Sequence, residues 1–223
     1  MIAWRSVTAG GFRDATFTLE PGAVCRLLLV SAADLELFLR LLTGAARPAE
    51  GEVLLFGTDL AQAGEEELLA LLARTGIVWP GGGFVSNLKT WENIMLPLWY
   101  HQGAHPETRE DEVIGLLERL GVLPDRIPAF LASLPGRLPP REQRILGVAR
   151  AMMQNADAMI YAGVLDGLDP PTRALVLEEA ARHRARRAGR VALFVAAGAQ
   201  GLPEPFDGAS LRQDLEGGIV PWD

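Results

Sequence analysis

The stretch PGAVCRLLLVSAADLELFLRLLTGAARPAEGEVLLFGTDL, residues 21–60, decides the fold. It contains a short apolar run at 25–30 that is typical of a strand, and apolar residues at helical spacing over 34–42 that stop at a Thr-Gly pair. A second strand pattern, bounded by glycines, follows at 51–57. A strand, a helix and a further strand in this order indicate an α/β protein.

The rest of the chain extends this pattern. Further strands are predicted at 15–22, 76–79, 158–162 and 191–197, and further helices at 65–72, 112–122, 142–153 and 173–187. Between residues 91 and 140 the pattern is helical, with prolines at the joints, which indicates an inserted helical lobe. Strands that alternate with helices of this length predict a mostly parallel sheet covered on both faces.

Composition excludes several classes of function. The net charge of −7 and the isoelectric point near 5.1 argue against a nucleic-acid partner, because binding to phosphates requires a basic surface. The single cysteine, Cys25, lies in an apolar run and is expected to be a small core residue in a reducing compartment. Neither a signal peptide nor a membrane span is expected, so we predict a cytoplasmic protein.

Four segments resemble the ATP-binding subunits of ABC transporters. Residues 21–60 resemble, without a gap, the region from the first core strand through the Walker A helix of that family. GVARAM at 147–152 is similar to the helix after the signature motif, and GLDPPTR at 167–173 is similar to the D-loop. NLKTWENIMLPL at 87–98 resembles the stretch after the Q-loop, especially in the lipid-transport branch that includes the MlaF and LolD types.

The resemblance covers nearly the whole chain and implies a particular fold. We expect an α/β protein with the ABC-type P-loop NTPase fold, in which a mostly parallel sheet is joined by an N-terminal antiparallel β part and an inserted helical subdomain. The whole chain, 1–223, is then one domain. Its RecA-like core comprises 1–80 and 141–223, and its helical subdomain comprises 81–140.

Against the family pattern, the Walker A residues are replaced. A Walker A loop needs glycines, a lysine and a hydroxyl to hold the phosphates and magnesium. In this chain the lysine position is Leu35, the hydroxyl position is Glu36, and the preceding glycine is Asp34. Two carboxylates near the phosphates would repel them, at about 4 kcal/mol for a like-charge contact at 4 Å and an effective dielectric of 20.

The other motifs of the family are also changed. The Walker B acids fall on Ala162 and Gly163, the Q-loop glutamine on Pro80 and the switch histidine on Ala197. The histidines that the chain does contain lie elsewhere, at His101, His105 and His183. The signature motif becomes LPPRE at 138–142, and TAGG at 8–11 is too short for the aromatic A-loop.

These substitutions predict a catalytically degenerate subunit. We therefore expect a pseudo-ATPase that is not an enzyme, has no catalytic, cofactor-binding or metal-binding residues, and does not bind the ATP and Mg that the family uses. Arg26 and Arg40 are the basic residues near the loop in sequence, and an ATP-binding ATPase with an unorthodox site is the first alternative. A soluble scaffold that has left transport is the second.

Several residues have two interpretations each. Asp34 and Glu36 stabilise the start of a helix or bind a cation. Trp79 and Trp91 are anchors for a membrane partner or belong to the core of the lobe. Asp169 makes a subunit contact or caps a helix, and the basic run at 182–190 is a solvated face or touches lipid headgroups.

The resemblance implies where such a subunit works. We expect a structural or regulatory component docked to an integral membrane permease, peripheral on the cytoplasmic face of the inner membrane, with lipid transport as the indicated branch. It pairs with a second copy or with another ABC subunit. The sequence leaves open the transported substrate, the direction of transport, the identity of that second subunit and whether another ligand takes the ATP site.

Overall fold

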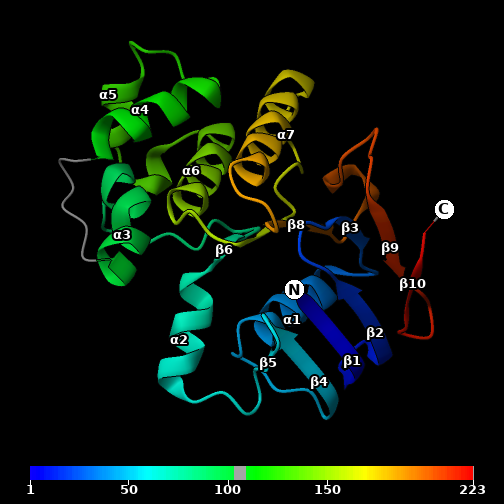
Figure 1. The fold of residues 1–223 in the computed structure, drawn as a ribbon. Coiled ribbons are helices and arrows are strands. Elements are labelled where there is room, and N and C mark those ends of the chain that lie inside the picture. The colour runs from blue at the N-terminus through cyan, green and yellow to red at the C-terminus, as the bar shows by residue number, and fades with distance from the viewer. Residues whose placement is uncertain (103–108, 223) are drawn as a thin grey trace.

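The computed structural model describes residues 1–102 and 109–222 and contains two sheets (Figure 1). The larger sheet has the strand order β10-β9-β3-β8-β7-β6, and β3 pairs in parallel with both β8 and β9. Its strands are β3 (Val24–Leu28), β6 (Thr75–Val78), β7 (Ala158–Ala162), β8 (Val191–Ala196), β9 (Ala209–Gln213) and β10 (Ile219–Pro221). Only the β9–β10 pair at one edge is antiparallel.

The smaller sheet is antiparallel and has the order β2-β1-β4-β5. Its strands are β1 (Ile2–Ala9), β2 (Phe12–Leu19), β4 (Glu50–Leu55) and β5 (Thr58–Asp59). Trp4 is fully buried on β1 and stacks on Phe38 of the first helix with ring centroids 4.9 Å apart. This aromatic contact fixes the small sheet against the helix that follows β3.

The helices lie on both sides of the larger sheet and beyond one end of it (Figure 1). They are α1 (Ala32–Leu42), α2 (Glu65–Ala73), α3 (Thr90–Gln102), α4 (Glu110–Arg119), α5 (Ile127–Ala132), α6 (Pro140–Met153) and α7 (Pro170–Ala185), with short 3-10 turns η2 (Pro135–Arg137) and η3 (Ala199–Gly201). Helices α3, α4 and α5 gather beside α6 and form the helical lobe.

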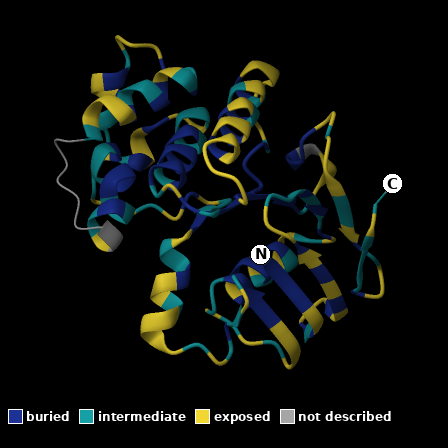
Figure 2. Ribbon diagram, in the orientation of Figure 1, coloured by how far each residue is buried: buried dark blue, intermediate teal, exposed yellow. Residues whose placement is uncertain are grey.

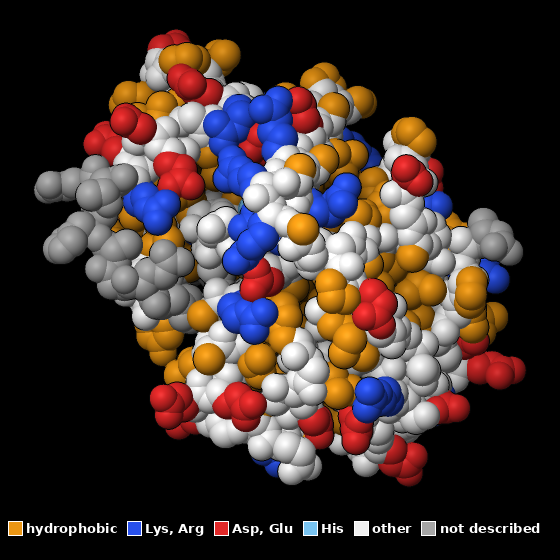
Figure 3. Space-filling view, viewed as in Figure 1, with side chains coloured by type: hydrophobic (Ala, Val, Ile, Leu, Met, Phe, Trp, Pro, Cys, Tyr) orange, Lys and Arg blue, Asp and Glu red, His pale blue; other side chains and the backbone are white. Residues whose placement is uncertain are grey.

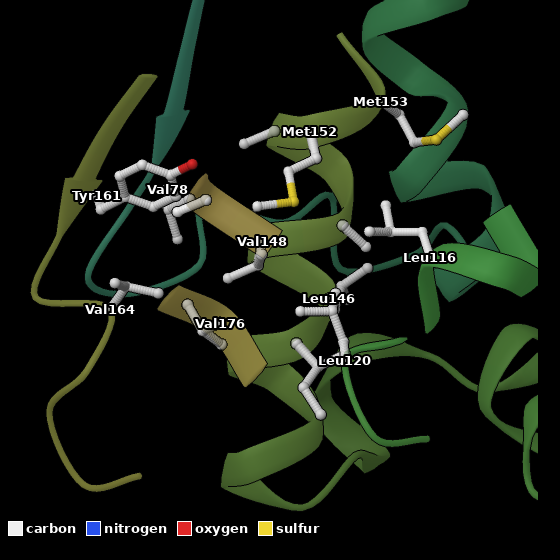
Figure 4. Close-up of a cluster of buried hydrophobic side chains, with 14 of the residues drawn as sticks. Val78, Leu116, Leu120, Leu146, Val148, Met152, Met153, Tyr161, Val164 and Val176 are labelled. Carbon is white, nitrogen blue, oxygen red and sulfur yellow. The ribbon is translucent and has the colours of Figure 1, made fainter. Parts of the chain in front are cut away.

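Alternate residues of the central strands supply two separate cores. Ile160 and Leu193 join the core that α1 and the small sheet cover, whereas Tyr161 and Phe194 join the core under α6 and α7. Figure 2 shows the central strands as buried, and Figure 4 shows Tyr161 beside side chains from α6 and α7. The strands are therefore apolar on both faces, as a covered parallel sheet requires.

The predicted fold class is confirmed. The strand at 158–162 and the helix after 65 begin where the sequence pattern places them, and the other predicted elements are present with shifted ends. The sequence analysis did not predict β1, β5, β9 or β10. The division into a core and a helical subdomain stays a prediction.

Cys25 behaves as the expected core residue. Its side chain is fully buried, and burial raises the pKa of the thiol to about 12. Among the described residues, no helix combines the length and the apolar character that crossing a membrane requires.

His183 makes the fold sensitive to acid. The side chain is buried on α7, its Nε2 has no hydrogen-bond partner among the described residues, and burial, with Arg190 nearby, lowers its pKa from 6.5 to about 4. Below pH 6.5 the unfolded chain binds this proton and the folded chain does not. Stability is therefore lost as the pH falls from about 6.5 towards 4.

We predict that His183→Leu reduces the difference in unfolding free energy between pH 7 and pH 5 by about 1–2 kcal/mol, because the variant lacks the group that protonates only when unfolded. Urea denaturation at the two pH values measures this difference. Arg184→Leu, at the exposed neighbouring position, is the control. An equal loss of stability in His183→Leu and the native chain would contradict the prediction.

Candidate functional site

The candidate site lies where the parallel strands of the larger sheet end. There the backbone N–H of Leu29 donates to the carbonyl oxygen of Ala196 at 2.8 Å, and the N–H of Gly163 donates to the carbonyl oxygen of Val195 at 2.8 Å. The ends of β3, β8 and β7 are therefore aligned side by side. Open α/β sheets bind their ligands outside the carboxyl ends of the strands, so this edge is the candidate site.

The positions predicted from the family pattern all follow strands that end at this edge. They are Leu35 and Glu36 on α1 after β3, Pro80 after β6, Ala162 and Gly163 at the end of β7, and Ala197 after β8. The assignment of these residues to family positions stays a prediction. Of the three histidines, His183 lies on α7, His105 lies outside the described residues, and the side chain of His101 is likewise not described.

Helix α1 begins within the stretch that aligns with the Walker A loop. Ser31 is its N-cap: the Ser31 hydroxyl accepts the N–H of Asp34 at 3.1 Å and donates to the Asp34 carboxylate at 2.6 Å. Asp34 thus stabilises the helix start, which agrees with the structural interpretation of this acid. Leu35 is 6% exposed and packs into the core, whereas Glu36 is exposed.

Gln213 closes the space beside the start of α1. Its side-chain amide donates to the carbonyl oxygen of Gly11 at 3.0 Å and accepts the N–H of Val30 at 3.0 Å. Gly11 lies in the turn between β1 and β2, and a Cβ atom added there would lie 2.0 Å from the Asp34 carboxylate. The turn, strand β9 and the helix start are therefore in direct contact.

Asp166 is the acid that the structure places beside the end of β7. A Cβ atom added at Gly163 would lie 3.1 Å from the Asp166 carboxylate, and one added at Gly201 would lie 2.6 Å from it. The sequence analysis did not identify Asp166, because it examined only the two positions at the strand end. Among residues 1–102 and 109–222, no group of three or more His, Cys, Asp or Glu side chains is arranged to hold a metal ion.

Arg26 and Arg40, the two arginines near the loop in sequence, differ in whether their side chains already have partners. The guanidinium of Arg26 lies 4.6 Å from the ring centroid of Trp222 and 5.2 Å from that of Phe206, and it also pairs with Glu204. Arg40 is exposed in the last turn of α1. The side chains around the helix start therefore do not fit a magnesium triphosphate in the manner of a Walker A loop, which requires a cation at this point.

A groove of about 420 Å³ separates the larger sheet from the helical lobe. Trp79 lines it from the end of β6, Leu96 and Pro97 line it from α3, and Arg150 lines it from α6. Trp91 is not among its lining residues and packs against the core of the lobe. The structure thus places the two tryptophans in different surroundings, and their role as partner anchors stays a prediction.

Asp169 caps α7. Its carboxylate accepts the N–H of Thr172 at 2.9 Å and the Thr172 hydroxyl at 2.8 Å, and these bonds lower the pKa of Asp169. Arg141, in the LPPRE segment, lies 3.7 Å from the same carboxylate and bonds to Thr172. The capping interpretation is confirmed, and the subunit contact stays a prediction.

Comparison with solved structures shows the fold. The chain matches the bacterial ABC transporter cassette MJ0796 in its dimeric structure with a TM-score of 0.84 and 19% identity, covering 98% of this chain and 96% of that one. The same cassette in a dimeric post-hydrolysis state bound to ADP and Pi matches with a TM-score of 0.84 and 18% identity, with the same coverage. The chain therefore has the fold of an ABC transporter cassette.

Comparison with curated proteins gives relatives in sequence. The chain is 31% identical over 166 residues to the methionine import ATP-binding protein MetN 2 of Enterococcus faecalis, covering 74% of this chain and 46% of that protein. It is also 31% identical over 166 residues to the methionine import ATP-binding protein MetN of Cereibacter sphaeroides, covering 74% of this chain and 45% of that protein. No protein-family model matches the chain.

This chain belongs to the nucleotide-binding domains of ABC transporters. It spans less than half the length of the curated relatives it matches. Neither comparison shows the lipid-transport branch or the catalytic degeneracy expected from the substitutions.

Two expectations from the sequence are corrected. A pseudo-ATPase that is not an enzyme and a chain that uses no ATP or Mg are both contradicted, because the relatives are named as ATP-binding proteins and a similar cassette was solved after hydrolysis with ADP and Pi. The expectations rested on a few substituted positions. Identity spread over 166 residues reports instead on the whole domain.

We predict that Leu35→Lys lowers the unfolding free energy by about 2–4 kcal/mol, because it places an ammonium group where a leucine is packed into the core. Chemical denaturation at pH 7 measures this loss. Glu36→Lys, at the exposed neighbouring position, is the matched control and should change stability by less than about 0.5 kcal/mol. Equal stability of the two variants would show that residue 35 does not point into the core.

Proposed function

We propose that this chain is an ATP-binding subunit of an ABC transporter that docks to a membrane permease and works as one of a pair of cassettes. The observation that supports it most directly is membership of the family together with a fold match over 98% of the chain. The dimeric state of the similar cassette supports pairing. Docking to a permease places the chain at the cytoplasmic face of the membrane.

ATP is the proposed ligand, in a site of unusual composition. The family supports ATP with magnesium, whereas the helix start offers Asp34 in place of a glycine and Leu35 in place of a lysine. A carboxylate about 4 Å from a phosphate opposes binding, and each 1.4 kcal/mol of repulsion weakens it tenfold. We therefore propose weak binding, in the millimolar range, without assigning a residue to the hydrolytic step.

The groove between the sheet and the lobe is the proposed docking surface. It is lined mainly by apolar side chains, including Trp79, Leu96 and Pro97, and its polar side chains include Thr43, Thr75, Arg150 and Gln154. An apolar groove with an aromatic wall fits the apolar face of a short helix. We propose that a cytoplasmic helix of the permease occupies it, with Trp79 as the anchor and Trp91 as part of the lobe.

The cargo is not assigned. Methionine import is the named activity of the relatives, and the segment at 87–98 resembles the lipid-transport branch. Lipid transport stays a proposal from that segment alone.

We predict that Asp34→Asn tightens ATP binding at least fivefold, because it removes one negative charge at the helix start while it keeps the contact with Ser31. Calorimetric titration with ATP and magnesium up to millimolar concentration measures the affinity. Asp207→Asn, an exposed acid on the segment that leads to β9, is the matched control and should leave the affinity unchanged. Absence of saturation in both the native chain and Asp34→Asn would count against ATP as the ligand.

We predict that Trp79→Ala reduces copurification of the native permease about tenfold, because a central aromatic anchor typically carries more than 1 kcal/mol of binding energy. Affinity capture of the tagged full chain from detergent-solubilised membranes measures it. Trp91→Ala, which removes a tryptophan outside the groove, should retain capture. A chain that captures no integral membrane protein would contradict docking itself.

A further inference from the structure

The loop between β6 and α3 has little to hold it in place by itself. It carries three consecutive glycines, Gly81 to Gly83, and Gly82 and Gly83 have positive φ values of +79° and +55°. Glycines lose the most conformational freedom on folding, so a loop rich in them needs outside contacts to keep one conformation. This loop begins at Trp79, a wall of the docking groove.

Two arginines of α6 bind the carbonyl groups of this loop. Arg144 Nη1 donates to the carbonyl oxygen of Pro80 at 2.5 Å. Arg150 donates from Nη2 to the carbonyl oxygen of Gly82 at 2.6 Å and from Nη1 to that of Gly83 at 2.7 Å, and its guanidinium lies 5.1 Å from the ring centroid of Phe84. Hydrogen bonds from charged donors are shorter and stronger than neutral ones.

These two arginines have no acidic partner among the described residues. By contrast, two neighbouring residues of α6 have partners of opposite charge: Glu142 pairs with Arg126, and Arg141 lies 3.7 Å from Asp169. Arg150 is partly buried, and this burial lowers the pKa of its guanidinium. Burying a cation costs free energy unless its donors are satisfied, and here loop carbonyls satisfy them.

The far end of the same loop is held differently. The buried side chain of Asn93 on α3 accepts the N–H of Val85 at 2.9 Å and donates to the carbonyl oxygens of Val85, Leu88 and Lys89 at 3.0–3.1 Å. The loop is thus divided into a half fixed by α6 and a half fixed by α3. Only the first half adjoins Trp79.

The first half of the loop sets the shape of the groove. A Cβ atom added at Gly83 would lie 3.5 Å from Trp79 Cγ and 3.6 Å from Arg150 Nη2, so the loop backbone lies between the tryptophan and the arginine. Arg150 itself lines the groove, and Arg144 lines a neighbouring cavity of about 160 Å³ together with Trp79 and Phe84. A change in the loop conformation would therefore change the position of the Trp79 side chain in the groove.

We propose that Arg144 and Arg150 are positioning residues that hold the loop, and with it Trp79, in the conformation that receives the permease helix. The proposal rests on the docking groove proposed above and adds what keeps that groove formed. Arg150 uses two separate nitrogens of a rigid planar group for the two carbonyl oxygens, whereas a lysine would have to bond both from a single nitrogen on a flexible chain. Arginine at 150 is thus required for more than its charge.

The test compares the double variant Arg144→Met and Arg150→Met with the native full chain. Amide hydrogen exchange should become at least tenfold faster at Gly82, whose N–H bonds to the Trp79 carbonyl oxygen, and stay unchanged at Val85, which Asn93 holds. Exchange in β7 should also stay unchanged, which shows that the variant folds. Copurification of the native permease should fall about tenfold, and Arg150→Lys should recover less than half of either effect.

Arg137→Met is the matched control, since Arg137 is exposed and its side chain makes no hydrogen bond or ion pair within the described part of the chain. Native exchange at Gly82 in the double variant would overturn the positioning role, and so would full permease capture with fast exchange. If the native chain captures no permease, the docking proposal fails, while the exchange measurement still decides whether the arginines fix the loop. Faster exchange in β7 would mean that the double variant is destabilised as a whole. The single variants Arg144→Met and Arg150→Met would then be compared by exchange at Gly82 and by permease capture.

Discussion

Parallel pairing of β3 with β8, and of β8 with β7, is the constraint on which the rest of the structure depends. Because neighbouring residues of each strand face opposite sides, the pairing demands two apolar layers, and α1 with the small sheet provides one while α6 and α7 provide the other. The helices run opposite to the strands they cover, so their N-terminal ends gather at the carboxyl edge of the sheet. The capped start of α1 lies at that edge, and so does Trp79 at the end of β6. Figure 3 shows Lys and Arg side chains in a band between the helical lobe and the core, whereas acidic side chains are frequent at the periphery of this face.

At the carboxyl edge of the larger sheet, the polar groups around the start of α1 are bonded to other groups of the protein. The Ser31 hydroxyl accepts the N–H of Asp34 at the start of α1, and a cap of this kind contributes about 1 kcal/mol. Gln213 joins the hairpin turn to the end of β3. Glycines have no side chains and could not make these contacts. The acid at position 34 therefore has a structural role, which is to hold the start of α1 through Ser31. The chain is related to ATP-binding proteins, yet its helix start is capped by its own side chains. The affinity for ATP is therefore the measurement that decides between a working and a lost nucleotide site.

Sequence patterns predicted the covered strands and the longer helices well because these elements are apolar on both faces or follow a regular helical spacing. The strand at 158–162 is entirely buried and has the predicted ends. Strand β1 was missed since a positive φ at Ser6 and register shifts interrupt its alternation. Strand β9 carries Arg212 and Gln213 beside apolar residues, and β10 ends in a proline, so neither has a clear pattern. Asp166 and the loop contacts of Arg144 and Arg150 depend on residues far apart in sequence, which no local pattern reveals.

The bonds of Gln213 also bear on when the first hairpin is secured. This one side chain ties residue 213 to residues 11 and 30, so the turn of the hairpin lacks this restraint until β9 has been made. Contacts between such distant positions are slow to form, because a long loop must close before they stabilise anything. During synthesis the N-terminal sheet therefore lacks these two hydrogen bonds until residue 213 has been added. The contact between the β1–β2 turn and the start of α1 is consequently completed only after β9 is in place.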